Sequence, residues 1–145
     1  MIVKLTQYVS YTIIFITLYA PYSAFANCTA SSSGVVFGSY DVFETTSNDS
    51  VGTITINCNT STSYTLKLSE GYGSFNERRL INGDNYLIYN LYTDTARNLI
   101  WGDGGSGSII QGKTTAEYSI YGRIPARQNV SVGSYSDTII ITLEY

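Results

Sequence analysis

Apolar and polar residues alternate along several short stretches of this chain. Over residues 51–58, the side chains of Ile54, Ile56 and Cys58 share one parity, while mostly polar residues occupy the other. Alternation with a period of two is typical of a β-strand that buries one face. The same reasoning predicts strands over residues 63–69, 86–92, 117–124 and 135–145, with shorter candidates at 35–37 and 99–101. The segment 86–92 is apolar on both parities, which favours a central strand.

Turn-forming residues separate the predicted strands, and no apolar stripe with helical spacing is found. Asn82-Gly83-Asp84 is a strong turn signal, and residues 102–107 form a glycine-rich loop. We therefore expect an all-β chain folded as an immunoglobulin-like β-sandwich. The pattern gives about six substantial strands where about seven are usual, and no residues follow Tyr145 to form another. The sandwich is therefore expected to be incomplete, lacking its last strand.

The first 26 residues have the features of an export signal. Lys4 gives a weakly positive start, residues 8–20 form an apolar run, and Ala24-Phe25-Ala26 has the small-x-small pattern that signal peptidase cleaves. We expect cleavage after Ala26, which leaves an exported domain of residues 27–145; cleavage near Ala20 is the alternative. The apolar run is shorter than the about 20 residues of a membrane span. We therefore expect no stable membrane insertion, with an N-terminal anchor as the alternative.

The expected mature chain contains two cysteines, Cys28 and Cys58. An even number of cysteines in an exported protein predicts a disulfide, with two free buried thiols as the alternative. The bond would close a loop of about 31 residues and stabilise the fold by roughly 3.5 kcal/mol in the chain-entropy treatment. This is a large share of the net stability of a domain of this size.

Charge and residue usage speak against several classes of function. Seven basic and eleven acidic residues give the expected mature chain a net charge of −4, which disfavours binding to nucleic acid or to anionic membranes. The sequence has no histidine, and no pair of carboxylates is singled out by spacing. We therefore expect no enzyme, no metal site and no cofactor. Trp101 and Asp103, at the glycine-rich loop, are the candidates for a surface-binding loop.

Several short motifs follow one another in a characteristic order along the expected mature chain. In sequence they are Cys28 with Gly38, the strand ending in Cys58, Leu68 with Gly71 and Gly73, Arg78-Arg79-Leu80, the segment from Tyr86 to Tyr92 leading to Asp94, Trp101-Gly102-Asp103-Gly104, the segment from Tyr121 to Ala126, and the segment from Gly133 to Thr138. This ordered set resembles the spore coat protein U domain family, which includes the pilins of archaic (Csu-type) chaperone–usher pili.

The resemblance implies a sandwich that lacks its last strand and is completed by a strand from another protein. In such pilins a periplasmic chaperone lends the strand, and the N-terminal extension of a neighbouring subunit replaces it at the outer-membrane usher. An open sandwich exposes an apolar groove and an unpaired strand edge. The face of the last predicted strand is the expected groove lining and chaperone contact: Ile139, Ile141, Leu143 and Tyr145. The alternative is that these four are ordinary core residues of a complete sandwich.

The segment before the first cysteine departs from the pattern of a polymerising pilin, which carries a donor extension there. Only Asn27 lies between the expected cleavage site and Cys28, and one strand residue spans only about 3.3 Å. We therefore expect an acceptor-only or terminal subunit of a surface pilus or coat, exported through the periplasm and supporting adhesion or biofilm formation. Its expected partners are a periplasmic chaperone, an outer-membrane usher and other pilin subunits. The alternative is a stand-alone secreted coat protein, or a module that binds carbohydrate or another surface through Trp101 and Asp103.

Overall fold

The computed structural model describes residues 26–145, so the predicted signal peptide lies outside the described residues except for its last position. The strands in this part of the chain are β1 Cys28–Ser32, β2 Asn48–Cys58, β3 Tyr64–Leu68, β4 Gly73–Ser74, β5 Glu77–Asn82, β6 Asn85–Tyr92, β7 Ile110–Gly112, β8 Ala116–Ile124 and β9 Ile141–Glu144. No helix that could cross a membrane occurs among residues 26–145. The all-β prediction is confirmed.

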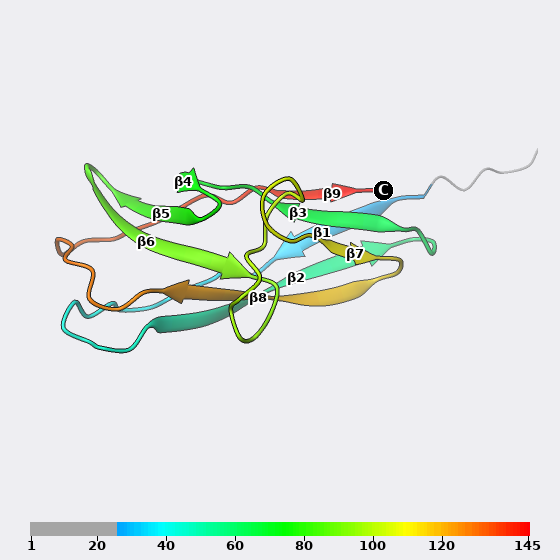
Figure 1. Ribbon diagram of the computed structural model, residues 1–145. Helices are drawn as coiled ribbons and strands as arrows, with labels where there is room; N and C mark the ends of the chain where they lie inside the picture. The colour runs from blue at the N-terminus through cyan, green and yellow to red at the C-terminus, as the bar shows by residue number, and fades with distance from the viewer. Residues whose placement is uncertain (1–25) are drawn as a thin grey trace, which may run out of the picture.

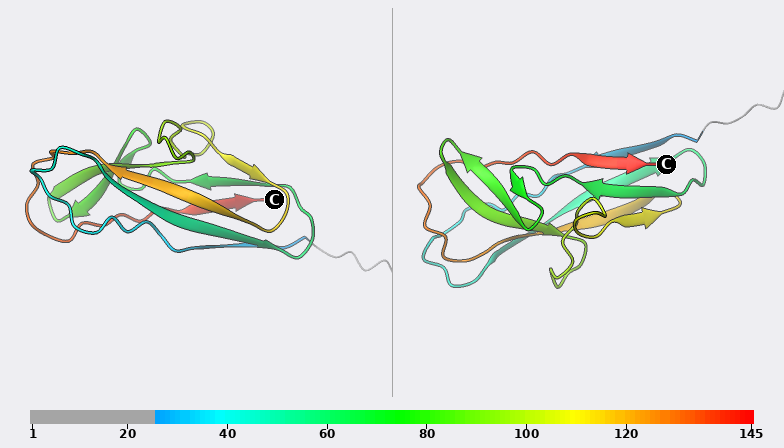
Figure 2. Two further views of the ribbon diagram at one scale, coloured as in Figure 1. Left: turned by 90° about the horizontal axis from the view of Figure 1, so that it is seen from below. Right: turned by 45° about the horizontal axis from the view of Figure 1, so that its top comes forward.

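The strands form two sheets that pack as a sandwich (Figure 1). Six strands hydrogen-bond in the order β1-β2-β8-β6-β5-β4, and three in the order β7-β3-β9. The larger sheet curls, so that β5 and β6 rise at one end to the level of β9 (Figure 1). The edge strands β1 and β9, which belong to different sheets, run close to each other (Figure 2). The predicted central position of residues 86–92 is confirmed, because β6 lies between β8 and β5.

The longest ladder pairs β2 with β8, from Asn48 opposite Ile124 to Ile56 opposite Ala116. The alternation of the sequence is preserved in both strands. Ile54, Ile56 and Ile124 are buried, while the residues of opposite parity are half-buried or exposed. Their inner faces pack with β3 and β6 into one hydrophobic core. The period-two pattern therefore predicted which face of these strands is buried.

One charged side chain, Arg78 of β5, lies in this core with no exposed surface. Its guanidinium donates two hydrogen bonds to the carbonyl oxygen of Ser69, at 3.1 and 2.6 Å. It donates two more, to Asn90 Oδ1 at 2.7 Å and to the carbonyl oxygen of Trp101 at 2.8 Å. Burial lowers the pKa of Arg78, yet a guanidinium stays charged in proteins. Arg78 therefore ties β5 to β6 and to the segments that follow β3 and precede β7.

Three segments with strand-like sequences are not regular strands over their full length. The predicted strand over 135–145 is a strand only over Ile141–Glu144, and residues 35–37 belong to no strand. Within residues 99–101, only Ile100 and Trp101 form bridges, and these are isolated. Residues 35–37 have no ladder partner within residues 26–145, and residues 135–140 bridge another strand only at Ser136, opposite Ile81. An apolar pattern alone does not make a strand without such a partner. These predictions were wrong about regular pairing.

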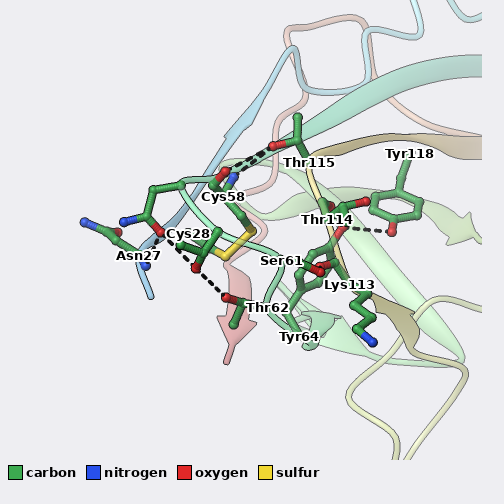
Figure 3. The surroundings of a disulfide bond; sticks show 12 residues. Asn27, Cys28, Cys58, Ser61, Thr62, Tyr64, Lys113, Thr114, Thr115 and Tyr118 are labelled. Atoms are coloured by element: carbon green, nitrogen blue, oxygen red, sulfur yellow. Dashed lines mark hydrogen bonds between the residues drawn. A yellow bond between two sulfur atoms is a disulfide. The ribbon is translucent and has the colours of Figure 1, made fainter. Parts of the chain in front are cut away.

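The predicted disulfide is confirmed: it joins Cys28, at the start of β1, to Cys58, at the end of β2 (Figure 3). The two residues are directly opposite each other in the β1–β2 ladder. Beside them, the backbone amide of Cys58 donates a hydrogen bond to Thr115 Oγ1 at 3.0 Å. The hydroxyls of Tyr64 and Tyr118 lie 2.9 Å apart. The bond therefore fastens β1 to β2 at one edge of the larger sheet.

Candidate strand-binding groove

A groove runs between an N-terminal wall, residues 32–42, and a C-terminal wall, residues 130–141. It consists of two adjoining hollows of about 300 Å³ and about 770 Å³. Residues that line both hollows make the groove continuous: Val35, Phe37, Leu80 and Asp137. Apolar side chains from both sheets form its floor: Leu68, Leu80, Leu87, Leu91, Ile120 and Ile124. The groove therefore gives access to core residues of the sandwich.

Two glycines on the inner face of the larger sheet let the N-terminal wall lie directly on that sheet. A Cβ at Gly52 would overlap the carbonyl group of Gly34. A Cβ at Gly122 would lie 2.7 Å from the ring of Phe37 and 2.8 Å from the side chain of Val35. Such close approaches are not tolerated in packed protein. The N-terminal wall can therefore lie this close to the sheet only because Gly52 and Gly122 have no side chain.

Side chains of β2 hold the N-terminal wall in place. Asn48 Nδ2 donates a hydrogen bond to the carbonyl oxygen of Phe37 at 3.2 Å. Ser50 Oγ donates to the carbonyl oxygen of Val36 at 2.6 Å. Within the described chain, no backbone hydrogen bond joins residues 35–40 to a strand. Residues 35–40 of this wall therefore have no ladder partner.

The far end of the N-terminal wall is fastened through Tyr40. Its hydroxyl donates a hydrogen bond to the carbonyl oxygen of Pro125 and accepts one from the backbone amide of Gln128, both at 2.8 Å. The side-chain amide of Gln128 in turn accepts from the backbone N–H of Ile88 at 2.7 Å and donates to its carbonyl oxygen at 2.8 Å. Gln128 thus replaces a ladder partner for β6 beyond the point where β8 ends at Ile124.

The C-terminal wall carries two of the four residues predicted to line a groove. Ile139 and Ile141 line the smaller hollow. Leu143 is half-buried against the core but is not part of either wall, and Tyr145 is exposed. Ile140 has the opposite parity and is 64% exposed. In the part of the chain that the structure describes, β9 pairs with β3 alone, so its second edge is unpaired.

Asp137 places a carboxylate at the junction of the two hollows. Its Oδ2 accepts a hydrogen bond from the hydroxyl of Tyr89 at 2.6 Å. Its Oδ1 accepts from the backbone amides of Tyr72 at 3.1 Å and Thr138 at 2.6 Å. A Cβ on Gly71 would overlap this carboxylate. Burial and the bond to Asp137 raise the pKa of Tyr89, so the phenol remains a donor. Asp137 therefore fastens the C-terminal wall to β6 and to the turn after β3.

The predicted surface-binding loop is wrong for Trp101. This side chain has no exposed surface, and its Nε1 donates a hydrogen bond to the carbonyl oxygen of Leu66 at 3.3 Å. Asp103 is exposed, and its Oδ1 accepts from the backbone amides of Ser106 at 2.7 Å and Gly105 at 3.0 Å. These bonds hold the pKa of Asp103 below its usual range. Trp101 is therefore a core residue, because its segment turns inward before the glycine-rich loop begins, and Asp103 shapes that loop.

Two groove features escaped the sequence analysis, although one left a signal. Gly52 and Gly122 both stand at inward positions of strands where the alternation calls for an apolar side chain. Such a gap indicates that another segment approaches the backbone closely. The position of Asp137 in the groove left no comparable signal. Residues 26–145 contain no group of three or more cysteines and acidic residues arranged to hold a metal ion.

Comparisons with known proteins agree with this architecture. The profile of the Spore Coat Protein U domain matches residues 15–142. Protein U of Myxococcus xanthus is 29% identical over 125 residues, covering 75% of this chain and 70% of Protein U.

A solved structure has the same fold. It is the CsuC-CsuE chaperone–tip adhesion subunit pre-assembly complex from archaic chaperone-usher Csu pili of Acinetobacter baumannii. One chain of it matches with a TM-score of 0.60 and 20% sequence identity. The match covers 83% of the present chain and 40% of that chain, so the present chain spans less than half of its length.

Proposed function

This chain belongs to the spore coat protein U domain family, and we propose that a partner protein completes its fold by inserting a β-strand into the groove. Family membership and the shared fold indicate a structural, non-enzymatic subunit of a surface coat or pilus. We further propose that residues 1–26 are removed on export and that residues 27–145 form the assembled domain.

The observation that carries the proposal is that a segment with no backbone partner and a segment with one unpaired edge face each other across an apolar groove. Residues 35–40 and the free edge that continues into β9 line its opposite sides. Unpaired backbone edges of this kind are templates for an added strand. A strand laid between them would hydrogen-bond to both and join the two sheets.

The free energy available from filling the groove is comparable with the stability of a whole domain. A strand of about nine residues, matching residues 133–141 in length, directs four or five side chains inward. Burial of each large apolar side chain contributes about 1.5–3 kcal/mol, or about 6–15 kcal/mol together. The net stability of a domain is about 5–15 kcal/mol. The chain without the strand should therefore fold poorly or aggregate.

The order of partners is proposed from the Csu structure, which contains a chaperone and a tip adhesion subunit in a pre-assembly complex. We propose that a periplasmic chaperone first donates the strand to this chain. An outer-membrane usher then exchanges it for a strand of another subunit, and the assembled pilus or coat supports adhesion. In both complexes the added strand lies against Ile139 and Ile141 and pairs with the free edge of β9, near Leu143 and Tyr145.

A self-complemented chain tests the proposal: the full chain with an alternating apolar strand fused after Tyr145 through a flexible linker. We expect the fused form to be exported as a soluble monomer that unfolds cooperatively in urea. The chain without the fused strand should aggregate or be degraded. A stable, cooperatively unfolding monomer whose stability does not change on fusion would show that no strand is needed.

Two neighbouring residues provide a matched control for the site of insertion. Ile139 lines the groove, whereas Ile140 is 64% exposed on the other face of the same segment. In the self-complemented chain, Ile139→Ser should lose about 2–4 kcal/mol, because an apolar contact becomes a hydroxyl without a partner. Ile140→Ser should stay within about 0.5 kcal/mol of the parent. Equal effects of the two substitutions would argue against strand insertion at this wall.

A further inference from the structure

Asp137 has hydrogen-bonding capacity that the described chain does not use. A carboxylate accepts about four hydrogen bonds, and three reach Asp137: two at Oδ1, from Tyr72 and Thr138, and one at Oδ2, from Tyr89. The carboxylate is half-buried and lines both hollows. One acceptor position on Oδ2 is therefore left at the point where the groove is otherwise bordered by apolar side chains.

A strand inserted beside the C-terminal wall would bring one of its residues directly opposite Asp137. Inward positions of this wall alternate, because Tyr135, Asp137, Ile139 and Ile141 are half-buried and line the groove while the residues between them are exposed. Directly opposed residues of neighbouring strands point to the same face, with Cβ atoms about 4.5–5.5 Å apart. The residue opposite Asp137 thus points inward within reach of the carboxylate, and residues two positions away face Tyr135 and Ile139.

Resting on the proposed strand insertion, we infer that Asp137 selects the sequence of the inserted strand. The strand carries a small hydrogen-bond donor, such as serine or threonine, opposite Asp137 and large apolar residues at the other inward positions. Asp137 is a specificity-determining residue of the groove in addition to its role in fastening the wall.

The selection follows from what happens to the carboxylate when the groove is covered. An apolar side chain opposite Asp137 would exclude water from Oδ2 without replacing the lost hydrogen bond, and an unsatisfied buried charge is costly. A hydroxyl supplies the fourth donor. The negative charge itself is tolerated, because the hydroxyl of Tyr89 and two backbone amides already donate hydrogen bonds to the carboxylate. The charge of Asp137 is therefore stable in the covered groove, whereas Oδ2 without its fourth hydrogen bond destabilises the complex.

The test uses a series of self-complemented chains in which each inward residue of the fused strand is, in turn, serine or leucine. Urea unfolding gives the ratio of unfolding constants for each serine–leucine pair. At all but one position leucine should be the more stable. At the position opposite Asp137, serine should lower the unfolding constant by about tenfold relative to leucine. The position that inverts also identifies the register of the strand.

Variants of the wall connect the inverted position to Asp137. In Asp137→Leu, leucine should become preferred at every inward position, and Asp137→Ala should do the same if Asp137→Leu does not fold. Thr138→Leu, on the exposed face of the same wall, should keep the inverted position. Each comparison is a ratio within one variant, so a general loss of stability cancels.

Two outcomes would overturn the inference in distinguishable ways. If leucine is preferred at every position in the parent chain, or if the inversion persists in Asp137→Leu and Asp137→Ala, the fused strand binds without selection by Asp137. If no fused strand changes the stability of the chain at all, strand insertion itself is refuted, and the selection is refuted with it.

Discussion

Replacement of Arg78 by methionine should destabilise the domain strongly, although methionine fits an apolar core. The substitution removes a guanidinium that donates four hydrogen bonds inside the core. The carbonyl oxygens of Ser69 and Trp101 lose the donors that Arg78 provides. Asn90 Oδ1 is less affected, because it also accepts from the backbone amide of Leu91 at 2.9 Å.

The magnitude follows from the two carbonyl groups that lose this donor. A buried acceptor left without a partner costs about 1–3 kcal/mol, so the pair costs about 2–6 kcal/mol. Removal of a buried cation offsets part of this cost, since desolvated charges are themselves unfavourable. We expect a net loss of about 2–4 kcal/mol. Arg78→Lys should also destabilise, because an ammonium cannot reproduce the planar fork that reaches three separate acceptors.

Urea unfolding of the self-complemented chain measures the loss, with the single tryptophan, the buried Trp101, as the fluorescent probe. A slope of about 1–3 kcal/mol per molar urea converts a loss of about 3 kcal/mol into a midpoint lower by about 1–3 M. Arg79→Met is the matched control, because Arg79 is partly exposed and pairs with Glu77 at 2.6 Å. Exposed pairs contribute about 0–1 kcal/mol. Arg78→Met with parental stability, or equal losses for both variants, would refute the reasoning.

Two further predictions concern the N-terminal wall and the titration of a buried phenol. Gly52→Ala should destabilise the self-complemented chain by about 1–3 kcal/mol, because the added methyl overlaps the N-terminal wall. Gly105→Ala is the control, because a Cβ there meets only a carboxylate beyond 3.4 Å. Similar urea midpoints for the two variants would contradict the role of Gly52. Burial and the hydrogen bond with Tyr118 raise the pKa of Tyr64 to about 12, above the value of about 10 for an unfolded chain. The stability that the neutral phenol of Tyr64 contributes is therefore complete below about pH 10 and is lost as the pH rises towards about 12. If the urea midpoint of Tyr64→Phe falls equally over this pH range, the loss belongs to another group.

The strands that could be predicted from the sequence are those whose alternation has a partner on both sides. In β2 and β8, residues such as Ile54 and Ile120 alternate with polar neighbours, and the ladder between the strands satisfies both backbones. Residues 35–37 are apolar as well, but the described chain offers them no ladder partner. Alternation reports which side chains are suited to burial, whereas pairing depends on a second segment. Residues 135–140 do alternate, yet within the described chain they pair with another strand only at Ser136, opposite Ile81.

The strand β5 was missed for the opposite reason. Its inward residues Arg78 and Asn82 are polar, so Leu80 alone marks the inward face of residues 77–82 as apolar. Arg78 can be buried only because carbonyl oxygens of other segments, those of Ser69 and Trp101, accept hydrogen bonds from its guanidinium. Composition likewise suggested an exposed Trp101 beside flexible glycines. In both cases the decisive contacts join residues far apart in the chain, which local periodicity does not encode.

The β2–β8 ladder also has a consequence for the order in which the chain folds. It pairs residues 48–56 with residues 116–124, so the central contact of the larger sheet cannot form until most of the domain is available. Contacts between distant segments form slowly, and unpaired edges promote aggregation during the delay. The disulfide, which closes only residues 28–58, can secure the first hairpin early but cannot shorten this wait. A strand-donating partner would therefore also act during folding, by protecting an exposed intermediate until the two halves of the sheet pair.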